Sequence, residues 1–160
     1  MVRIIHEMQI PDKLKLYVNG AHGMNLGTRG PDLRPEYARV LGSRYVDDQH
    51  IHLFFDGPSA GRTIQNLNDN GMVSVILCSL ENYESFQFKG KCINVREANA
   101  EELEQISTYL KDINVLLVKV GFPDQGMYKY PHDSMMTLLM EVDEIFEQTP
   151  KVGTGQKVFA

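Results

Sequence analysis

Short apolar or alternating runs joined by short turns dominate the first 97 residues of this chain. The runs are typical of β-strands and lie at 22–30, 33–46, 47–57, 71–80 and 83–95. A single helical stretch interrupts them, so an alternating βα parallel sheet fits poorly. Closure into a barrel removes the exposed edges of short strands. The sequence therefore predicts an α+β fold, mainly β: a small antiparallel β-barrel with peripheral helices.

The individual strands differ in pattern. Gly30-Pro31-Asp32 is a turn sequence that joins the first two runs as a hairpin. The run 71–80 is almost continuously apolar, which predicts a strand buried on both faces. The run 83–95 alternates between a polar and an aromatic face, with a local fault at Gly90.

The remaining segments complete the organisation of the chain. We expect a short helix over 11–20, and a surface helix capped by Asn99 that breaks before Val115. Residues 135–146 are expected to form a last strand that enters a short helix, with the methionines of this stretch filling the core. We predict one domain over residues 1–150 and a loose C-terminal tail over 151–160.

Charge and composition exclude several classes of protein. The chain has 160 residues, with 16 lysines and arginines against 21 acids and a formal net charge of −5. That balance argues against a general nucleic-acid surface, so no nucleic-acid partner is expected. Cys78 and Cys92 lack metal-ligand spacing and are expected to be reduced core residues. No apolar window is long enough to span a bilayer and no signal-peptide pattern is found, so we expect a cytoplasmic protein without a membrane partner.

The helix within residues 57–71 begins unusually. Ser59 is a good N-cap, and Asn70-Gly71 is a good stop. Counted from Ser59, Arg62 takes the third helical position, where a capping box has Glu or Gln. A base at the electropositive end of a helix is unfavourable unless an anion lies there, and Arg62 with Thr63 and a small neighbouring glycine predicts a phosphate site. The alternative is that Arg62 bends into solvent.

Two further segments carry groups that could contact the same phosphate. Strand alternation in 33–46 places Arg39 and Ser43 on one face and Arg44 on the other. Lys89 on the run 83–95 is a weaker candidate. The alternative for all of these cations is solvation or a weak surface ion pair.

Three segments in order, ARVLGSRYV, AGRTIQNLNDNGMVSVIL and YESFQFKGKCINV, give the chain a family resemblance. It resembles the pyridoxamine 5'-phosphate oxidase-like family of FMN-binding split barrels over roughly residues 12 to 97. The resemblance implies a split-barrel homodimer with FMN at the interface. It also implies that Arg62 and Thr63 bind the FMN phosphate and that Arg39, Val40 and Leu41 line the flavin. Ser85 or Gln87 would be the polar side chain on the strand before the family's glycine, represented here by Gly90.

The departures from the family pattern bear on activity. Thr63 stands where the family usually has lysine, which removes one charged phosphate contact. The chain has no tryptophan, and its last ten residues hold no arginine, whereas the oxidases proper use both near the substrate. The resemblance therefore implies a flavin-dependent oxidoreductase other than the vitamin B6 oxidase. The alternatives are a non-catalytic flavin- or nucleotide-binding protein for storage or sensing, and a fold that has kept its dimer and lost FMN.

Other chemistry-bearing residues have weaker claims. His50 and His52 share one strand face, but no third ligand is evident, so no metal site is predicted. His22 and His132 either lie near a flavin or are satisfied polar residues. Phe122, Tyr128 and Tyr130 either cover a flavin ring or anchor the loop 121–133 without any ligand.

Overall fold

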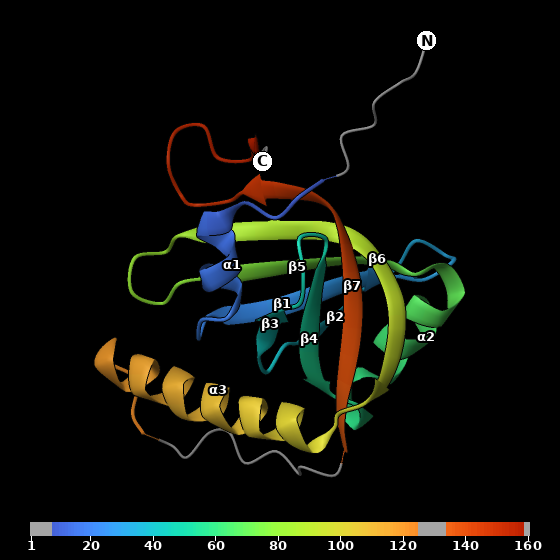
Figure 1. Cartoon of the computed structure of the whole chain (residues 1–160), viewed down its shortest axis with the longest axis horizontal. Helices are drawn as coiled ribbons and strands as arrows, with labels where there is room; N and C mark the ends of the chain where they lie inside the picture. The colour runs from blue at the N-terminus through green and yellow to red at the C-terminus, as the bar shows by residue number, and fades with distance from the viewer. Residues whose placement is uncertain (1–7, 125–133, 159–160) are drawn as a thin grey trace.

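The structure is a computed structural model that describes residues 8–124 and 134–158. One mainly antiparallel sheet of eight strands curls into a half-barrel, and three helices lie outside it (Figure 1). The helices are α1 (Asp12–Val18), α2 (Gly61–Asn70) and α3 (Ala100–Lys119), and the short 3-10 turn η1 (Pro58–Ala60) precedes α2. The strands are β1 (Gly23–Arg29), β2 (Pro35–Arg39), β3 (Ser43–Tyr45), β4 (His50–Asp56), β5 (Met72–Cys78), β6 (Ser85–Glu97), β7 (Met135–Glu147) and β8 (Lys157–Val158).

Closure of the sheet joins segments that are neighbours in sequence. The strand order is β2-β1-β5-β6-β7-β4-β3, so β2 and β3 lie at its two ends although only three residues separate them. The connection is bonded to β4: Leu41 N–H donates to the carbonyl of Phe54 at 2.7 Å, and Phe54 N–H donates to that of Gly42 at 3.0 Å. These bonds draw the two ends together. The expected split barrel is confirmed.

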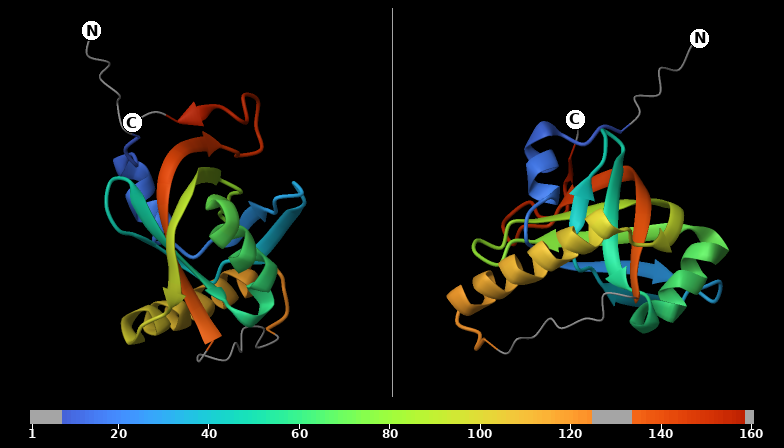
Figure 2. Two further views of the ribbon diagram at one scale, coloured as in Figure 1. Left: turned by 90° about the vertical axis from the view of Figure 1, so that its right-hand side faces the viewer. Right: turned by 60° about the horizontal axis from the view of Figure 1, so that its bottom comes forward.

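The inner face of the sheet forms the core. Alternate residues of β1 and β5 are buried there, as the period of two requires, β4 and β7 add further buried residues, and α1 adds Leu14 and Val18. Met135 and Met140 are fully buried on β7, which confirms the methionines as core residues. Figure 2 shows α3 lying across one side of the curled sheet, while α2 packs beside β1 and β2.

The fault predicted at Gly90 is confirmed. The register between β6 and β7 shifts between Lys89 and Gly90. A β-carbon at Gly90 would lie 1.9 Å from the carbonyl oxygen of Glu141 on β7, so the backbones approach too closely for any side chain.

Three predictions about strands were wrong. The run 33–46 is two strands, β2 and β3, because Gly42 turns the chain at φ +134°. β5 is buried on one face only, since among the described residues no helix covers its outer face, where Met72 and Ile76 are exposed. Residues 135–147 form one strand without a helix, because its whole length pairs with β6 and its first half also with β4.

Two further expectations need correction. Helix α3 continues unbroken past Val115 to Lys119. The tail 151–160 was expected to be loose, but its residues Lys157–Val158 pair with β7. The extent of the domain, residues 1–150, stays a prediction.

Candidate functional site

The N-terminal end of α2 offers room and donors for an anion. The Arg62 side chain is 60% exposed, and its Nε lies 3.7 Å from Oε2 of Glu36 on β2. A β-carbon at Gly61 would have nothing within 4 Å, so open space lies beside the first turn. Thr63 is fully buried, and its Oγ1 has no hydrogen-bond partner among the described residues. An unpartnered hydroxyl and an exposed guanidinium therefore lie in one turn at the start of the helix.

The start of α2 differs from the sequence prediction. Ala60, not Ser59, is the N-cap, because Ser59 belongs to η1 and its backbone N–H donates to Asp56 Oδ2 at 3.0 Å. Arg62 is therefore the second residue of α2 rather than the third. Glu36 and Asp56 already place two carboxylates near this electropositive end, so a phosphate would compete with them.

The β2–β3 segment presents its predicted residues differently. Val40 and Leu41 are buried in the core, and their backbone N–H groups already donate to the carbonyls of Met24 and Phe54. Arg39 is exposed at the end of β2. Ser43 opens β3, and its hydroxyl donates to the carbonyl of Val18 in α1. The shared face predicted for Arg39 and Ser43 is wrong, because they belong to strands with different partners.

Ser85 and Gln87 lie apart from Arg62 within one chain. Ser85 is buried at the start of β6, where it pairs with Cys78 at the far end of β5 from the α2 junction. Its hydroxyl donates to the Tyr83 carbonyl. Gln87 is part of a ladder across the sheet, since its Nε2 donates to Ser74 Oγ at 2.9 Å and its Oε1 accepts from Gln148. One chain therefore does not bring these two residues to the Arg62 end of α2.

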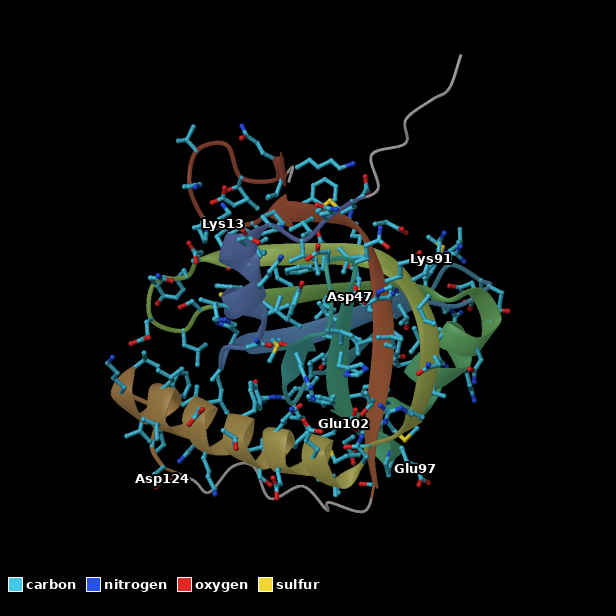
Figure 3. All side chains as sticks on the ribbon, viewed as in Figure 1. Lys13, Asp47, Lys91, Glu97, Glu102 and Asp124 are labelled. Atoms are coloured by element: carbon cyan, nitrogen blue, oxygen red, sulfur yellow. The ribbon has the colours of Figure 1, made fainter. Side chains whose placement is uncertain are left out.

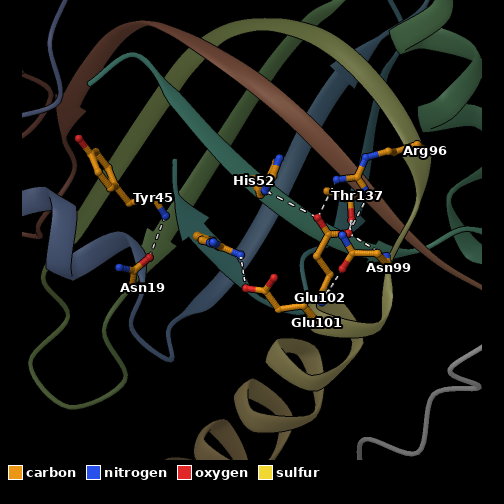
Figure 4. A network of polar contacts seen from close by, with 9 residues as sticks. Asn19, Tyr45, His52, Arg96, Asn99, Glu101, Glu102 and Thr137 are labelled. Atoms are coloured by element: carbon orange, nitrogen blue, oxygen red, sulfur yellow. Dashed lines mark hydrogen bonds and ion pairs between the residues drawn. The ribbon is translucent and has the colours of Figure 1, made fainter. Parts of the chain in front are cut away.

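A buried carboxylate lies beneath the first turn of α3. Glu102 receives a two-point hydrogen bond from Arg96 at 2.7 and 2.8 Å and a third bond from Thr137 Oγ1 at 2.8 Å (Figure 4). It also closes a capping box with Asn99. The hydrogen bonds from Arg96 hold the pKa of Glu102 at about 2. His52 Nδ1 lies 3.8 Å from Glu102 Oε1, and burial lowers the pKa of His52.

A cleft separates α3 from the segments 19–21 and 42–45. Its volume is about 560 Å³. Arg44 lies in it and forms an ion pair with Glu101 at 2.9 Å, one of the contacts drawn in Figure 4. Its aromatic lining residues are Tyr45, Phe54 and Tyr109. Because Gly42 lines the cleft, the cleft directly adjoins the strand segment assigned to the flavin.

The remaining candidates are placed as follows. His50 and His52 share a face of β4, as predicted, but their near neighbours are different carboxylates, and no group of three ligands for a metal is found within 8–124 and 134–158. Cys78 and Cys92 are free, as predicted, but both are only half-buried, and of the two Cys92 packs against the core. Phe122 is 55% exposed. Tyr128, Tyr130 and His132 lie outside the described residues. None of the described helices is both long and apolar enough to cross a membrane.

Sequence reasoning missed the Glu102 cluster and the cleft. Asn99 was recognised as a cap, and Glu102 three residues later is the matching capping-box residue. That spacing could have indicated a satisfied Glu102. Its contacts with Arg96 and Thr137 depend on the pairing of β6 with β7, which no local pattern reveals.

Comparison with known proteins places the fold. No protein-family model matches the chain, and no curated protein matches its sequence. Solved structures do match. HupZ of Group A Streptococcus is 18% identical with a TM-score of 0.55, over 92% of this chain and 98% of that one. An FMN-binding protein of Syntrophomonas wolfei is 14% identical with a TM-score of 0.53, over 84% and 81%. A pyridoxamine 5'-phosphate oxidase-related, FMN-binding protein of Nostoc punctiforme is 14% identical with a TM-score of 0.52, over 91% and 85%. The chain thus has the fold of FMN-binding split barrels.

Proposed function

We propose that this protein binds FMN, with the phosphate at the N-terminal end of α2. The observation that carries the proposal is the combination of exposed Arg62, open space at Gly61 and the unpartnered hydroxyl of Thr63 in one helical turn. That turn lies on a fold shared with proteins described as FMN-binding. In the proposal, Arg62 and Thr63 bind the phosphate, and the ring lies along the segment 39–41, of which Arg39 is the exposed residue.

We also propose a homodimer in which the flavin lies between two copies. Ser85 lies at the far end of β5 from α2, and the side chain of Gln87 is bonded to Ser74 and Gln148 within its own chain. A second copy would allow both sets of residues to contact one cofactor. Light scattering at micromolar concentration tests this, and a monomer would contradict it.

As activity we propose a flavin-dependent oxidoreductase that acts on a small molecule. The flavin, when bound, supplies hydride or electron transfer, while the protein binds and orients both reactants. Turnover coupled to NAD(P)H or oxygen supports this activity. Flavin binding without turnover would favour a storage or sensing protein.

The test of FMN binding compares FMN with riboflavin by calorimetric titration. If the phosphate is bound at α2, FMN binds more tightly than riboflavin. Arg62→Ala should weaken FMN by roughly tenfold, since one charge-assisted contact is lost at a partly exposed site, and leave riboflavin unchanged. Glu36→Gln should strengthen FMN binding a few-fold, because it removes the competing carboxylate near Arg62.

Arg34→Ala is the matched control, because Arg34 is exposed and has its own partner in Asp32. It should leave both dissociation constants unchanged. Equal affinities for FMN and riboflavin, or an unchanged FMN constant in Arg62→Ala, would refute the phosphate assignment.

A further inference from the structure

The cleft beside α3 has one wall made by a single helical face. Its α3 residues are spaced three, four, seven, eight and eleven positions after Glu101, so they share one side of the helix. They are Glu101, Glu104, Gln105, Thr108, Tyr109 and Asp112. The opposite wall is the segment 19–21 together with 42–45. A volume of about 560 Å³ is within the range of small-molecule sites.

Negative charge exceeds positive charge among the described residues that line this cleft. Three carboxylates face one guanidinium, and that guanidinium, Arg44, is paired with Glu101. Glu104 and Asp112 form no ion pair within the part of the chain that the structure describes. The Oε1 of Gln105 is buried and has no hydrogen-bond partner among those residues. A ligand here would therefore find unused acceptors and excess negative charge.

The cleft also has an aromatic floor. Phe54 and Tyr109 are buried against Gly42, where a β-carbon would lie 3.1 Å from Phe54 and 3.5 Å from Tyr109. Tyr109 keeps its hydroxyl bonded to the His22 carbonyl at 2.7 Å, which fixes its ring. Because Phe54 and Tyr109 are almost fully buried, they border the cleft only as an apolar floor, and the carboxylates supply its charge.

We infer that the α3 cleft binds a small organic cation, an amine or amidine with an apolar or aromatic body. The carboxylates of Glu104 and Asp112 would attract its positive group, a donor would be available to Gln105, and its body would lie against Tyr109 and Phe54. An anionic or phosphorylated compound is disfavoured, because Arg44, the one cation among the described residues that line the cleft, is already paired with Glu101. The idea that this ligand is a substrate rests on the proposed flavin function, because the cleft adjoins the segment assigned to the flavin. Binding of the cation to the cleft does not require that a flavin is bound.

The experiment uses three matched probes: phenethylamine, 2-phenylethanol and 3-phenylpropionate. Each is titrated into the full chain at pH 7, with and without FMN, and followed by amide chemical shifts and calorimetry. We expect the amine to bind at least tenfold more tightly than the alcohol, the acid to bind more weakly still, and shifts to be concentrated at Gly20, Gly42 and Thr108.

Paired variants locate the charge that causes the preference. Glu104→Gln/Asp112→Asn should abolish the preference for the amine over the alcohol. Glu97→Gln/Asp143→Asn removes the same charge from exposed positions outside the cleft and should retain it. In Figure 3 Glu97 lies near the end of β6, whereas Glu102 lies between α3 and the sheet.

The outcomes separate the two proposals. Equal binding of the amine and the alcohol to the wild-type chain, or shifts confined to other surfaces, would overturn the cleft assignment whether or not the variants fold. Amine binding without any FMN binding would leave the cleft proposal standing and refute the flavin proposal. FMN binding without a preference for the amine would leave the flavin proposal standing and refute the cleft proposal.

Discussion

Replacing Glu102 by Gln should remove a measurable part of the stability of the fold. The Glu102 side chain is 3% exposed and holds Arg96 through two hydrogen bonds. Glutamine keeps an acceptor for the capping box with Asn99, so the substitution mainly removes the charge. Lowering the pKa from 4.5 to about 2 corresponds to about 3 kcal/mol at neutral pH. Because Arg96 is 43% exposed, solvent screening reduces this to about 2 to 3 kcal/mol.

The pH dependence distinguishes this electrostatic effect from a packing defect. A carboxylate with a lowered pKa binds fewer protons in the folded chain than in the unfolded chain. Its stabilisation is therefore complete above about pH 4.5 and is lost as the pH falls toward 2. Urea unfolding of both proteins should show a difference in unfolding free energy that shrinks to about 1 kcal/mol near pH 3, because glutamine does not titrate.

Glu101→Gln is the control. Glu101 is next to Glu102 in the sequence, but its side chain is 67% exposed and forms a surface pair with Arg44. It should cost less than about 1 kcal/mol. A difference for Glu102→Gln that is the same at pH 7 and pH 3 would refute the electrostatic account.

Three further predictions follow from single contacts. Gly90→Ala should lower the unfolding free energy by about 2 kcal/mol or more, because its β-carbon would meet the Glu141 carbonyl, and an unchanged melting temperature would contradict the close approach. Thr63→Val should raise stability by about 1 kcal/mol without ligand, since it removes a buried unpartnered hydroxyl; denaturant unfolding that shows a loss would mean that the hydroxyl is satisfied. Burial lowers the pKa of His22, so its midpoint in an NMR titration should lie below 6.5, and a midpoint at or above that value would contradict the dominance of burial.

Local sequence patterns predicted the parts of this fold that local geometry determines. Alternating runs and short turns predicted the antiparallel barrel, because side-chain alternation follows from the strand itself. An isolated glycine in an alternating run predicted the fault at Gly90, and Asn99 was recognised as a helix cap. Each of these depends on residues close together in the chain.

The parts that were missed depend on contacts between distant segments. The apolar run of β5 does not say whether a second layer covers it, and Ile76 is on an uncovered face. Ser59 was a reasonable N-cap, but Asp56 shifts the helix start by forming η1. The candidates Arg39, Val40, Leu41 and Ser43 were placed on one continuous strand, whereas pairing with β1 and β4 divides that strand between the two ends of the sheet.

Gly42 connects the two candidate sites. Its φ of +134° is a conformation that residues with a side chain rarely adopt, and its missing β-carbon allows Phe54 and Tyr109 to approach. The turn at Gly42 ends β2 at Arg39, on the side of the sheet where α2 packs, and places Arg44 in the cleft under α3. The proposed cation would therefore lie at the Arg44 end of a short segment whose Arg39 end belongs to the strand that packs beside α2. In the two proposals, a single break in a strand separates the flavin segment from one wall of the adjoining cleft.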